Sequence, residues 1–267
     1  MYQLSVEIPS CKDPWTVPLK QRIDRFYGIC DAGFKCIMAI YDAPDGATFR
    51  YRVYNVHQSL RKSNIYRLCY FFADELEYII PGIKSCSVLL LCRTRWTPLL
   101  EQAVSAARSR DIPILFDIDD LVYDLDCLRL LTNTLNISLD NAGNLCNWSS
   151  YVATVYLAAK LADGFVCTNE YLGNRLREKF GKPYVCIDNS LNEEQLAVSA
   201  ELRRQKAAQK SDDNYVIGYF SGSPTHVNDF NAAAPELAEL LSENEKMKLL
   251  LVGYMHPPKC MEKLKSA

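Results

Sequence analysis

Tyr215-Val-Ile-Gly-Tyr-Phe-Ser-Gly-Ser-Pro-Thr-His-Val-Asn-Asp229 is the most informative stretch of the 267-residue chain. An apolar strand, predicted over residues 215–220, leads into a turn of small residues, and a helical pattern follows over residues 232–241. Small residues let the backbone approach a ligand, and the N–H groups at a helix start point toward it. The stretch suits an anion such as a diphosphate, although a strand, small turn and helix also build any ordinary α/β unit.

The rest of the chain alternates short apolar, β-branched runs with helical patterns. Predicted strands cover residues 35–41, 67–72, 87–92, 113–117, 164–168, 184–188 and 248–253. Predicted helices cover residues 50–61, 99–110, 149–162 and 170–180, whereas residues 1–30 give the mixed signals of a tail or a peripheral strand. This β-α-β-α order predicts an α/β fold of two Rossmann-like parallel-sheet domains with helices on both faces.

A polar, charged segment interrupts the alternation. We expect an N-terminal domain over residues 1–192, a linker over 193–213 and a partial C-terminal domain over 214–267. The last part offers only two strands and one or two helices, which are too few to cover both faces of a parallel sheet. The second domain is therefore expected to be incomplete.

Composition narrows the class of function. The chain is 49% hydrophobic and 23% charged, as in ordinary globular proteins, and its net charge of −2 argues against nucleic acid as a partner. Its eleven cysteines form no CxxC pair and no Cys/His cluster, which favours reduced thiols in a cytoplasmic protein over disulfides or a metal site. There is no signal-peptide pattern and no apolar run of about 20 residues, so no membrane span is expected.

An acidic cluster follows the strand predicted over residues 113–117. Asp117, Asp119 and Asp120 lie at its carboxyl end, where α/β sheets place their ligands. The cluster suits a metal or sugar hydroxyls, or it caps the next helix. It also resembles the FDxDxT motif of haloacid-dehalogenase-type phosphatases, with Asp117 as nucleophile and Asp119 as acid/base. That motif wants a Thr where this chain has Leu121.

Basic residues flank two predicted strands. Arg50 and Arg52 lie near the start of the helix predicted after the strand over residues 35–41. A positive charge there opposes the helix dipole, so these arginines suit a phosphate or carboxylate ligand, or they pair with nearby acidic residues. Arg93 and Arg95 follow a buried strand and suit either a ligand or a salt bridge. His226 follows the small-residue turn, where it suits a phosphate or a sugar, or a helix cap.

The order of these motifs resembles the glycosyltransferases of the two-domain GT-B fold, close to family 4 (group 1). The resemblance runs from about residue 36 to about residue 258. It is carried by Phe49-Arg-Tyr-Arg-Val53, Cys92-Arg93, Phe116-Asp-Ile-Asp-Asp-Leu121, Asp163-Gly-Phe-Val-Cys-Thr168, Cys186-Ile-Asp-Asn189, Ile217-Gly-Tyr-Phe-Ser-Gly-Ser-Pro-Thr-His226 and Leu250-Leu-Val-Gly253.

In such enzymes the C-terminal domain holds the nucleotide-sugar donor. Carried over by position, Ser221, Gly222 and Ser223 would line the donor diphosphate, with His226 and Asp229 near it. Many members place an Arg after the glycine turn and a Lys-Gly soon after it, where this chain has Ser223 and, further on, Asn228-Asp229. The acidic E-x7-E segment that grips the donor would fall beyond Ala267, so the resemblance implies a C-terminally truncated member.

The N-terminal domain of such enzymes holds the acceptor. Arg50 and Arg52 would border it, with Asp119 and Asp120 supporting the crevice. The resemblance implies sugar transfer from a nucleotide-sugar to a polysaccharide or lipid-linked acceptor, in cell-surface polysaccharide biosynthesis. The nucleotide-sugar is a substrate, no cofactor or metal is expected, and a lipid-linked acceptor leaves room for peripheral membrane association. The alternatives are an Asp-nucleophile phosphohydrolase and a non-catalytic α/β remnant, and an exposed apolar face on the second sheet would favour the remnant.

Overall fold

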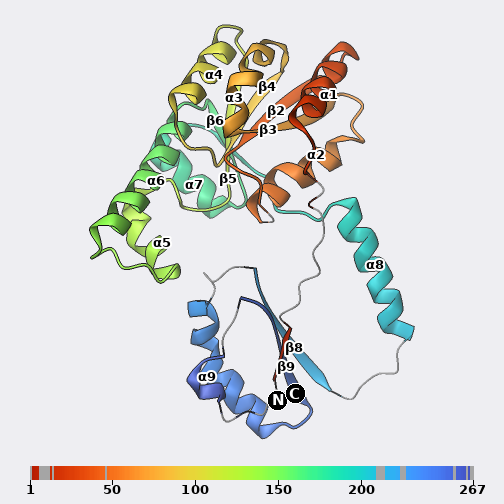
Figure 1. The fold of residues 1–267 in the computed structure, drawn as a ribbon, viewed down its shortest axis with the longest axis vertical. Coiled ribbons are helices and arrows are strands. Elements are labelled where there is room, and N and C mark those ends of the chain that lie inside the picture. Colours follow the sequence, from red (N-terminus) through yellow and green to blue (C-terminus); the bar gives the residue numbers. More distant parts are fainter. Residues whose placement is uncertain are drawn as a thin grey trace. The chain divides into compact units, whose positions relative to one another are not determined.

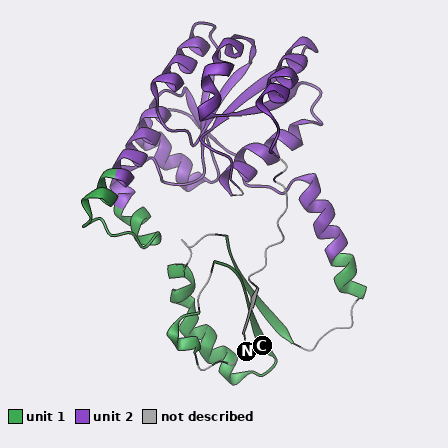
Figure 2. Ribbon diagram, in the orientation of Figure 1, with its two compact units in different colours: residues 1–11, 129–146, 203–267 green, residues 12–128, 147–202 purple. Residues whose placement is uncertain are grey.

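The computed structural model describes residues 2–5, 13, 15–45, 47–208, 214–222, 227–254, 257–262 and 264. They belong to two compact units, shown in Figure 2. The larger unit comprises residues 12–128 and 147–202, and the smaller unit comprises residues 1–11, 129–146 and 203–267. Each unit contains a parallel β-sheet, which confirms the predicted α/β fold class.

The larger sheet has six strands in the order β3-β2-β4-β5-β6-β7, and every neighbouring pair is parallel. Its strands are β2 (Lys35–Tyr41), β3 (Tyr66–Phe72), β4 (Val88–Cys92), β5 (Ile114–Ile118), β6 (Gly164–Cys167) and β7 (Tyr184–Cys186). Most of these are nearly continuous apolar runs because the strands of a parallel sheet are covered on both faces.

The strand order reverses between β2 and β4. From β2 the chain runs outward to β3 and then crosses back to β4 on the other side of β2, where Tyr41 pairs with Cys92. Ligands of open α/β sheets bind outside the carboxyl ends of the strands at such a switch point. The carboxyl ends of β2 and β4 are therefore the first place to look for a site.

Helices precede, connect and follow these strands (Figure 1). They are α1 (Leu19–Asp31), η1 (Arg50–Tyr54), α2 (Asn55–Leu60), η2 (Ala73–Glu75), α3 (Leu76–Ile79), η3 (Ile80–Ser85), α4 (Pro98–Arg108), η4 (Leu125–Cys127), α5 (Leu128–Thr134), α6 (Ala142–Lys160), α7 (Glu170–Phe180) and α8 (Glu193–Ala208). The chain segment η1 is a π-helix, and it continues directly into α2.

An aromatic core joins η1 to one face of the sheet. Phe49 and Val53 are fully buried there against Tyr70 and Phe72 of β3. On α1, Phe26 packs edge-on against Phe71, with ring centroids 6.2 Å apart. Side chains of neighbouring residues on a strand point to opposite faces, so η1 and α1 cover opposite faces at this edge of the sheet.

The prediction of a tail or strand over residues 1–30 is wrong for residues 19–30, which belong to α1. Phe26 and Arg22 face inward from this helix, one turn apart. The interleaved Lys20, Asp24 and Arg25 hide the apolar period in the sequence. Arg22 is buried because it forms an ion pair with Glu75.

The free edge of β3 has its polar groups satisfied by side chains. Arg22 donates to the Tyr70 carbonyl at 3.3 Å, and His57 bonds to the Leu68 carbonyl. The Phe72 N–H donates to Glu75 at 2.9 Å. An edge strand with these groups bonded is protected against pairing with another strand.

The smaller sheet has the order β1-β9-β8 and is also parallel. Its strands are β1 (Tyr2–Ser5), β8 (Tyr215–Ser221) and β9 (Met247–Gly253), so residues from the start of the chain complete it. The helix α9 (Val227–Glu243) packs on one face, with Phe230 buried against Tyr219. On the opposite face of β8, Val216 and Phe220 are 61% and 71% exposed.

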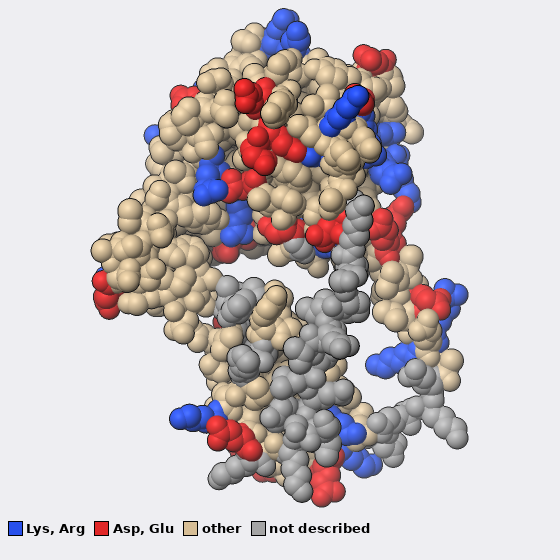
Figure 3. Space-filling view, viewed as in Figure 1, with Lys and Arg blue, Asp and Glu red and all other residues tan. Residues whose placement is uncertain are grey.

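Acidic and basic side chains are interspersed over the face of the larger unit seen in Figure 3. This mixture agrees with the near-zero net charge of the chain. Across the described residues, the structure contains no helix with both the length and the apolar character that crossing a membrane requires.

Candidate functional site

A buried ion pair anchors the carboxyl edge of the larger sheet. Arg52, from η1, is 1% exposed, and Asp117, at the end of β5, is 3% exposed. The two side chains meet in a bidentate pair, with Nε to Oδ1 at 2.7 Å and Nη2 to Oδ2 at 2.9 Å. Arg52 also donates through Nη1 to the Ile187 carbonyl at 2.6 Å and to Asn189 Oδ1 at 3.2 Å. The guanidinium therefore ties the end of β5 to the loop after β7.

Asp117 is placed to hold Arg52 rather than to meet a substrate. Burial raises the pKa of Asp117 to about 6, against the opposing effect of the adjacent guanidinium. Both carboxylate oxygens are already bonded to Arg52. A nucleophilic carboxylate must be accessible to the phosphorus it attacks, so this geometry argues against the phosphohydrolase alternative.

A second polar cluster, which we call the Arg93 cluster, lies at the switch point itself. Arg93 follows β4 and donates through Nη1 to Thr48 Oγ1 at 2.9 Å and to Asp119 Oδ1 at 3.3 Å. The Thr48 hydroxyl donates in turn to Asp119 Oδ2 at 2.9 Å, and Arg93 Nε reaches the Tyr151 hydroxyl at 3.3 Å. These groups are partly buried, and they carry donors and acceptors suited to sugar hydroxyls.

The backbone at Arg93 adopts an uncommon conformation. Its φ is +47°, in the left-handed region that residues other than Gly, Asn and Asp seldom occupy. Its N–H is nevertheless bonded to the Asp117 carbonyl at 2.9 Å, which continues the sheet ladder beyond β4. A conformation of this kind costs about 1–3 kcal/mol and is concentrated at functional sites.

The remaining predicted residues lie around these two groups. Arg50 turns away to the Trp15 ring, with its guanidinium carbon 4.8 Å from the ring centroid. Asp120 is exposed and accepts a hydrogen bond from the Leu121 N–H at 2.8 Å. Arg52 and Asp119 therefore lie together at the carboxyl edge of the sheet, whereas Arg50 packs on Trp15 and Asp120 faces solvent.

Sequence reasoning left two members of the Arg93 cluster unassigned. Thr48 comes from the loop before η1 and Tyr151 from α6, far from Arg93 in the chain. Arg93 and Asp119 carried a sequence signal, because each follows a buried strand. Arg95, the exposed cation two residues after Arg93, forms an ion pair with Asp42 at 2.7 Å.

Thr94 offers a test of the packing beside the Arg93 cluster. It is 0% exposed, and its hydroxyl finds no hydrogen-bond partner among the described residues. A buried hydroxyl without a hydrogen-bond partner lowers the free energy of unfolding by about 1–3 kcal/mol, and an apolar side chain of the same shape avoids this cost. We expect Thr94→Val to leave the free energy of unfolding unchanged or to raise it by about 1 kcal/mol in urea denaturation.

The same substitution three residues later is the matched control. The Thr97 hydroxyl caps α4 by accepting from the Leu100 N–H at 3.1 Å, so Thr97→Val should cost about 1 kcal/mol. A loss of similar size in Thr94→Val would show that the Thr94 hydroxyl is bonded after all.

The predicted donor residues belong to the smaller unit. Ser221 is buried at the end of β8, Gly222 is exposed after it, and Asp229 lies in the first turn of α9. Ser223 and His226 fall outside the described residues. A Cβ built on Gly222 would meet no atom of the described residues within 4 Å, so those residues leave the backbone at this position open to approach.

Gly253 supports the same turn and was not assigned a role from the sequence. Its φ is +95°, and a Cβ there would lie 1.9 Å from the Ser221 carbonyl oxygen. The Tyr254 N–H donates to that oxygen at 3.2 Å. The end of β9 is thus packed directly on the end of β8, at the base of the turn.

Thiols and metal-ligand groupings add little to either site. The ten cysteines that the structure describes are all free, although Cys167 and Cys186 pair across neighbouring strands with their sulfurs 3.7 Å apart. Within the described ranges, no group of three or more His, Cys, Asp or Glu residues is placed to hold a metal ion.

Comparisons with known proteins find similarity in structure alone. No protein-family model matches the sequence, and no curated protein matches it either. The chain is similar to the structure of Phytolacca americana UGT2 complexed with UDP-2fluoro-glucose and pterostilbene, at 9% identity and a TM-score of 0.46. The match covers 83% of this chain and 72% of that one.

Two other solved structures show similarity of the same order. Anabaena Alr3699/HepE in complex with UDP and glucose matches at 14% identity and a TM-score of 0.42, over 82% of this chain and 61% of that one. UDP-GlcNAc 2-epimerase from Neisseria meningitidis, bound to UDP-GlcNAc, matches at 13% identity and a TM-score of 0.42, over 85% of this chain and 68% of that one.

Proposed function

We propose that the protein is a glycosyltransferase of the GT-B type, close to family 4, which takes its sugar from a nucleotide-sugar. The observation that carries the proposal is the turn at Gly222. This residue is exposed at the carboxyl end of β8, and no atom of the described residues lies within 4 Å of the position that its Cβ would take. The helix α9 begins five residues later, at Val227. A diphosphate can approach such a backbone closely, as in other strand–turn–helix sites for phosphates.

The charge of the leaving group requires stabilisation in this reaction. When the glycosidic bond to the donor breaks, negative charge develops on the departing nucleoside diphosphate. In this proposal the backbone N–H groups of the turn bond to the diphosphate, and the N-terminal end of α9 adds its partial positive charge. Ser221, Ser223, His226 and Asp229 are the other donor-side residues that we propose.

The Arg93 cluster supports an acceptor role for the larger unit. It gathers a guanidinium, a carboxylate and two hydroxyls at the switch point of a parallel sheet. We propose that a saccharide or lipid-linked acceptor bonds to this cluster, with Asp119 among its contacts. Arg52 acts as a positioning residue because its donors are engaged with Asp117, Ile187 and Asn189.

The order of motifs between residues 36 and 258 supports the assignment to this family. We propose that the larger part of the chain corresponds to the acceptor domain of such enzymes and that residues 214–267 correspond to donor-domain sequence.

Calorimetry with UDP, GDP and dTDP tests the proposal. We expect one of them to bind, and we expect Gly222→Val to weaken it by about 2 kcal/mol, roughly 30-fold, because a side chain removes the close backbone contact. The fold should tolerate this change, since the position is open. Gly28→Val is the matched control, because Gly28 is also exposed and free of neighbours within 4 Å.

Absence of binding to all three nucleotides would contradict the proposal. In that event the non-catalytic alternative gains weight, since the exposed Val216 and Phe220 give the smaller sheet an apolar face suited to a protein partner.

A further inference from the structure

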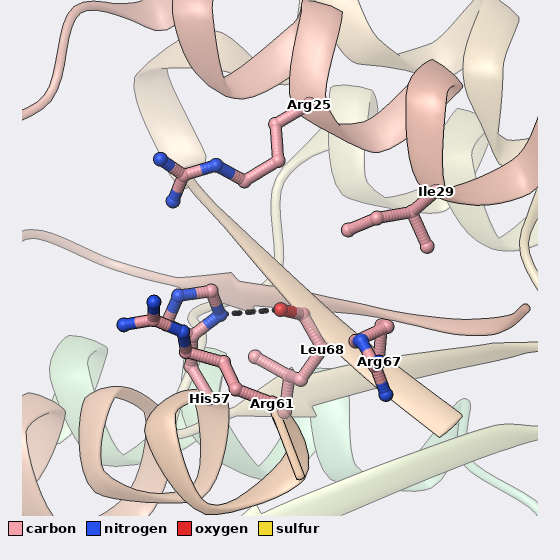
Figure 4. Close-up of a pocket in the computed structure, with 6 residues that line it drawn as sticks. All are labelled: Arg25, Ile29, His57, Arg61, Arg67 and Leu68. Carbon is pink, nitrogen blue, oxygen red and sulfur yellow. Dashed lines mark hydrogen bonds between the residues drawn. The ribbon is translucent and has the colours of Figure 1, made fainter. Parts of the chain in front are cut away.

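A polar cavity lies on the larger unit, near the amino end of β3. It has a volume of about 320 Å³, within the usual range of small-molecule sites. Figure 4 shows its lining residues, which are Arg25 and Ile29 of α1, His57 of α2, Arg61 after α2, and Arg67 and Leu68 of β3. Arg67 and Leu68 are early residues of β3, whereas the Arg93 cluster follows the carboxyl ends of the strands.

The charge of this cavity is positive and uncompensated. None of the described residues that line it is acidic. The side chains of Arg25 and Arg61 form no ion pair and no hydrogen bond with any residue in the described part of the chain. Figure 4 shows them on opposite sides of the cavity. Guanidinium groups left free in this way favour an anionic ligand.

Arg67 is held rigidly in place. Its guanidinium carbon lies 3.9 Å from the centroid of the Phe34 ring. Its Nη1 donates to the Leu60 carbonyl at 3.1 Å, the Tyr66 carbonyl at 2.9 Å and the Ser63 carbonyl. A guanidinium that is already ordered loses little conformational entropy when it binds a ligand.

His57 contributes a neutral, polar wall. Its Nδ1 donates to the Leu68 carbonyl, which leaves Nε2 as an acceptor in the uncharged ring. Burial lowers the pKa of His57, and the nearby charges of Arg25 and Arg61 lower it further. An anion between these arginines would reverse their effect and favour protonation of the ring.

We propose that this cavity binds a small phosphate monoester. The guanidiniums of Arg25 and Arg61 bond to the phosphate oxygens, which they match in geometry and charge. Arg67 adds positive charge at the other end of the cavity. Ile29 and Leu68 supply an apolar surface for the organic part, which a cavity of this volume has room to enclose. The ligand would bind at the edge of the sheet opposite the proposed acceptor crevice.

Phenyl phosphate is a suitable probe because it combines a phosphate monoester with an apolar group. We expect calorimetry on the full chain to show binding, and the double substitution Arg25→Ala/Arg61→Ala to weaken it at least about tenfold. The Gly222→Val variant should bind it as the wild type does, which separates this cavity from the nucleotide turn. Arg110→Ala removes an exposed arginine elsewhere and should change the affinity by less than about twofold.

A histidine titration adds a second readout. Phenyl phosphate should raise the pKa of His57, measured by NMR, and should fail to do so in the double variant. Equal binding by the double variant and the wild type would overturn the proposal, as would no binding of phenyl phosphate at all.

The source of the phosphate can be distinguished directly. A monoester is also present on the headgroup of phosphatidic acid, so vesicles of phosphatidylcholine with and without phosphatidic acid form the second arm. Binding of phenyl phosphate alone indicates a soluble ligand. Binding to the phosphatidic acid vesicles that is lost in Arg25→Ala/Arg61→Ala assigns the same phosphate site to a lipid.

Discussion

Arg52→Met is expected to lower the free energy of unfolding of the larger unit by about 3–5 kcal/mol at pH 8. The substitution keeps the apolar stem of the side chain but leaves the carboxylate of Asp117 buried without a cation. Removing one partner of a buried pair is costly because the other charge remains desolvated. All three tryptophans lie in the larger unit, so urea unfolding followed by tryptophan fluorescence reports on it.

The loss should depend on pH with a definite sign. Burial already raises the pKa of Asp117 to about 6, and Arg52 opposes that rise, so without Arg52 the pKa will be higher still. The unfolded pKa of Asp is about 3.9, so the folded variant binds a proton more tightly than the unfolded chain. Stability then falls as the pH rises through the folded pKa. The cost of Arg52→Met should therefore be smaller at pH 5 than at pH 8.

Two further variants separate this effect from general damage. Arg95→Met breaks an ion pair in which Arg95 is 50% and Asp42 28% exposed, and it should cost less than about 1 kcal/mol. Arg52→Met/Asp117→Leu removes both charges and should be more stable than Arg52→Met alone. If the double variant were the less stable of the two, the cost of Arg52→Met would not come from a buried, uncompensated charge on Asp117.

The strands of the larger sheet could be predicted because their cause is local. A run such as Val88–Cys92 is apolar over its whole length, which a buried parallel strand requires. The predicted boundaries differ from the observed ones by no more than one residue at the start of each strand and two residues at its end. The helix α1 was missed because Arg22 is an inward-facing position occupied by a charge, and its partner Glu75 is distant in the chain.

The smaller unit shows the limit set by non-local pairing. The strand β9 pairs with β8 on one side and with Tyr2–Ser5 on the other. No local pattern indicates that the first residues of a chain join a sheet formed by the last ones. The predicted linker over residues 193–213 and the predicted domain boundaries remain predictions.

The candidate site was predictable in its position but only partly in its members. The rule that ligands bind at the carboxyl ends of strands pointed to Asp119 and Arg93. Whether an arginine there meets a ligand or a carboxylate depends on which segments fold over it. Arg52 and Asp117 form a buried pair because η1 brings the arginine directly over β5. Thr48 and Tyr151 became visible as members of the cluster only through their distances to Arg93.

Gly253→Ala is expected to destabilise the smaller unit by about 2–5 kcal/mol. The left-handed backbone of Gly253 alone costs an L-residue roughly 1–2 kcal/mol. The added Cβ would also lie 1.9 Å from the Ser221 carbonyl oxygen, and crowding of this kind costs roughly 1–3 kcal/mol. Hydrogen exchange of the β8 and β9 amides should accelerate, while tryptophan-detected unfolding of the larger unit stays unchanged. Because the clash falls on Ser221, nucleotide affinity should fall as well.

Two other alanine substitutions separate the cost of the left-handed backbone at Gly253 from the cost of the clash with Ser221. Gly33 has a φ of +80° but no atom within 4 Å of its Cβ position, so Gly33→Ala carries the backbone cost alone, roughly 1–2 kcal/mol in the larger unit. Gly222 has neither constraint, and Gly222→Ala should leave exchange in β8 and β9 unchanged. If Gly253→Ala exchanged as slowly as Gly222→Ala, the ends of β8 and β9 would not be packed as closely as the structure has them. The turn at Gly222 would then lack its support, because Gly253 is the residue that meets Ser221 at its base.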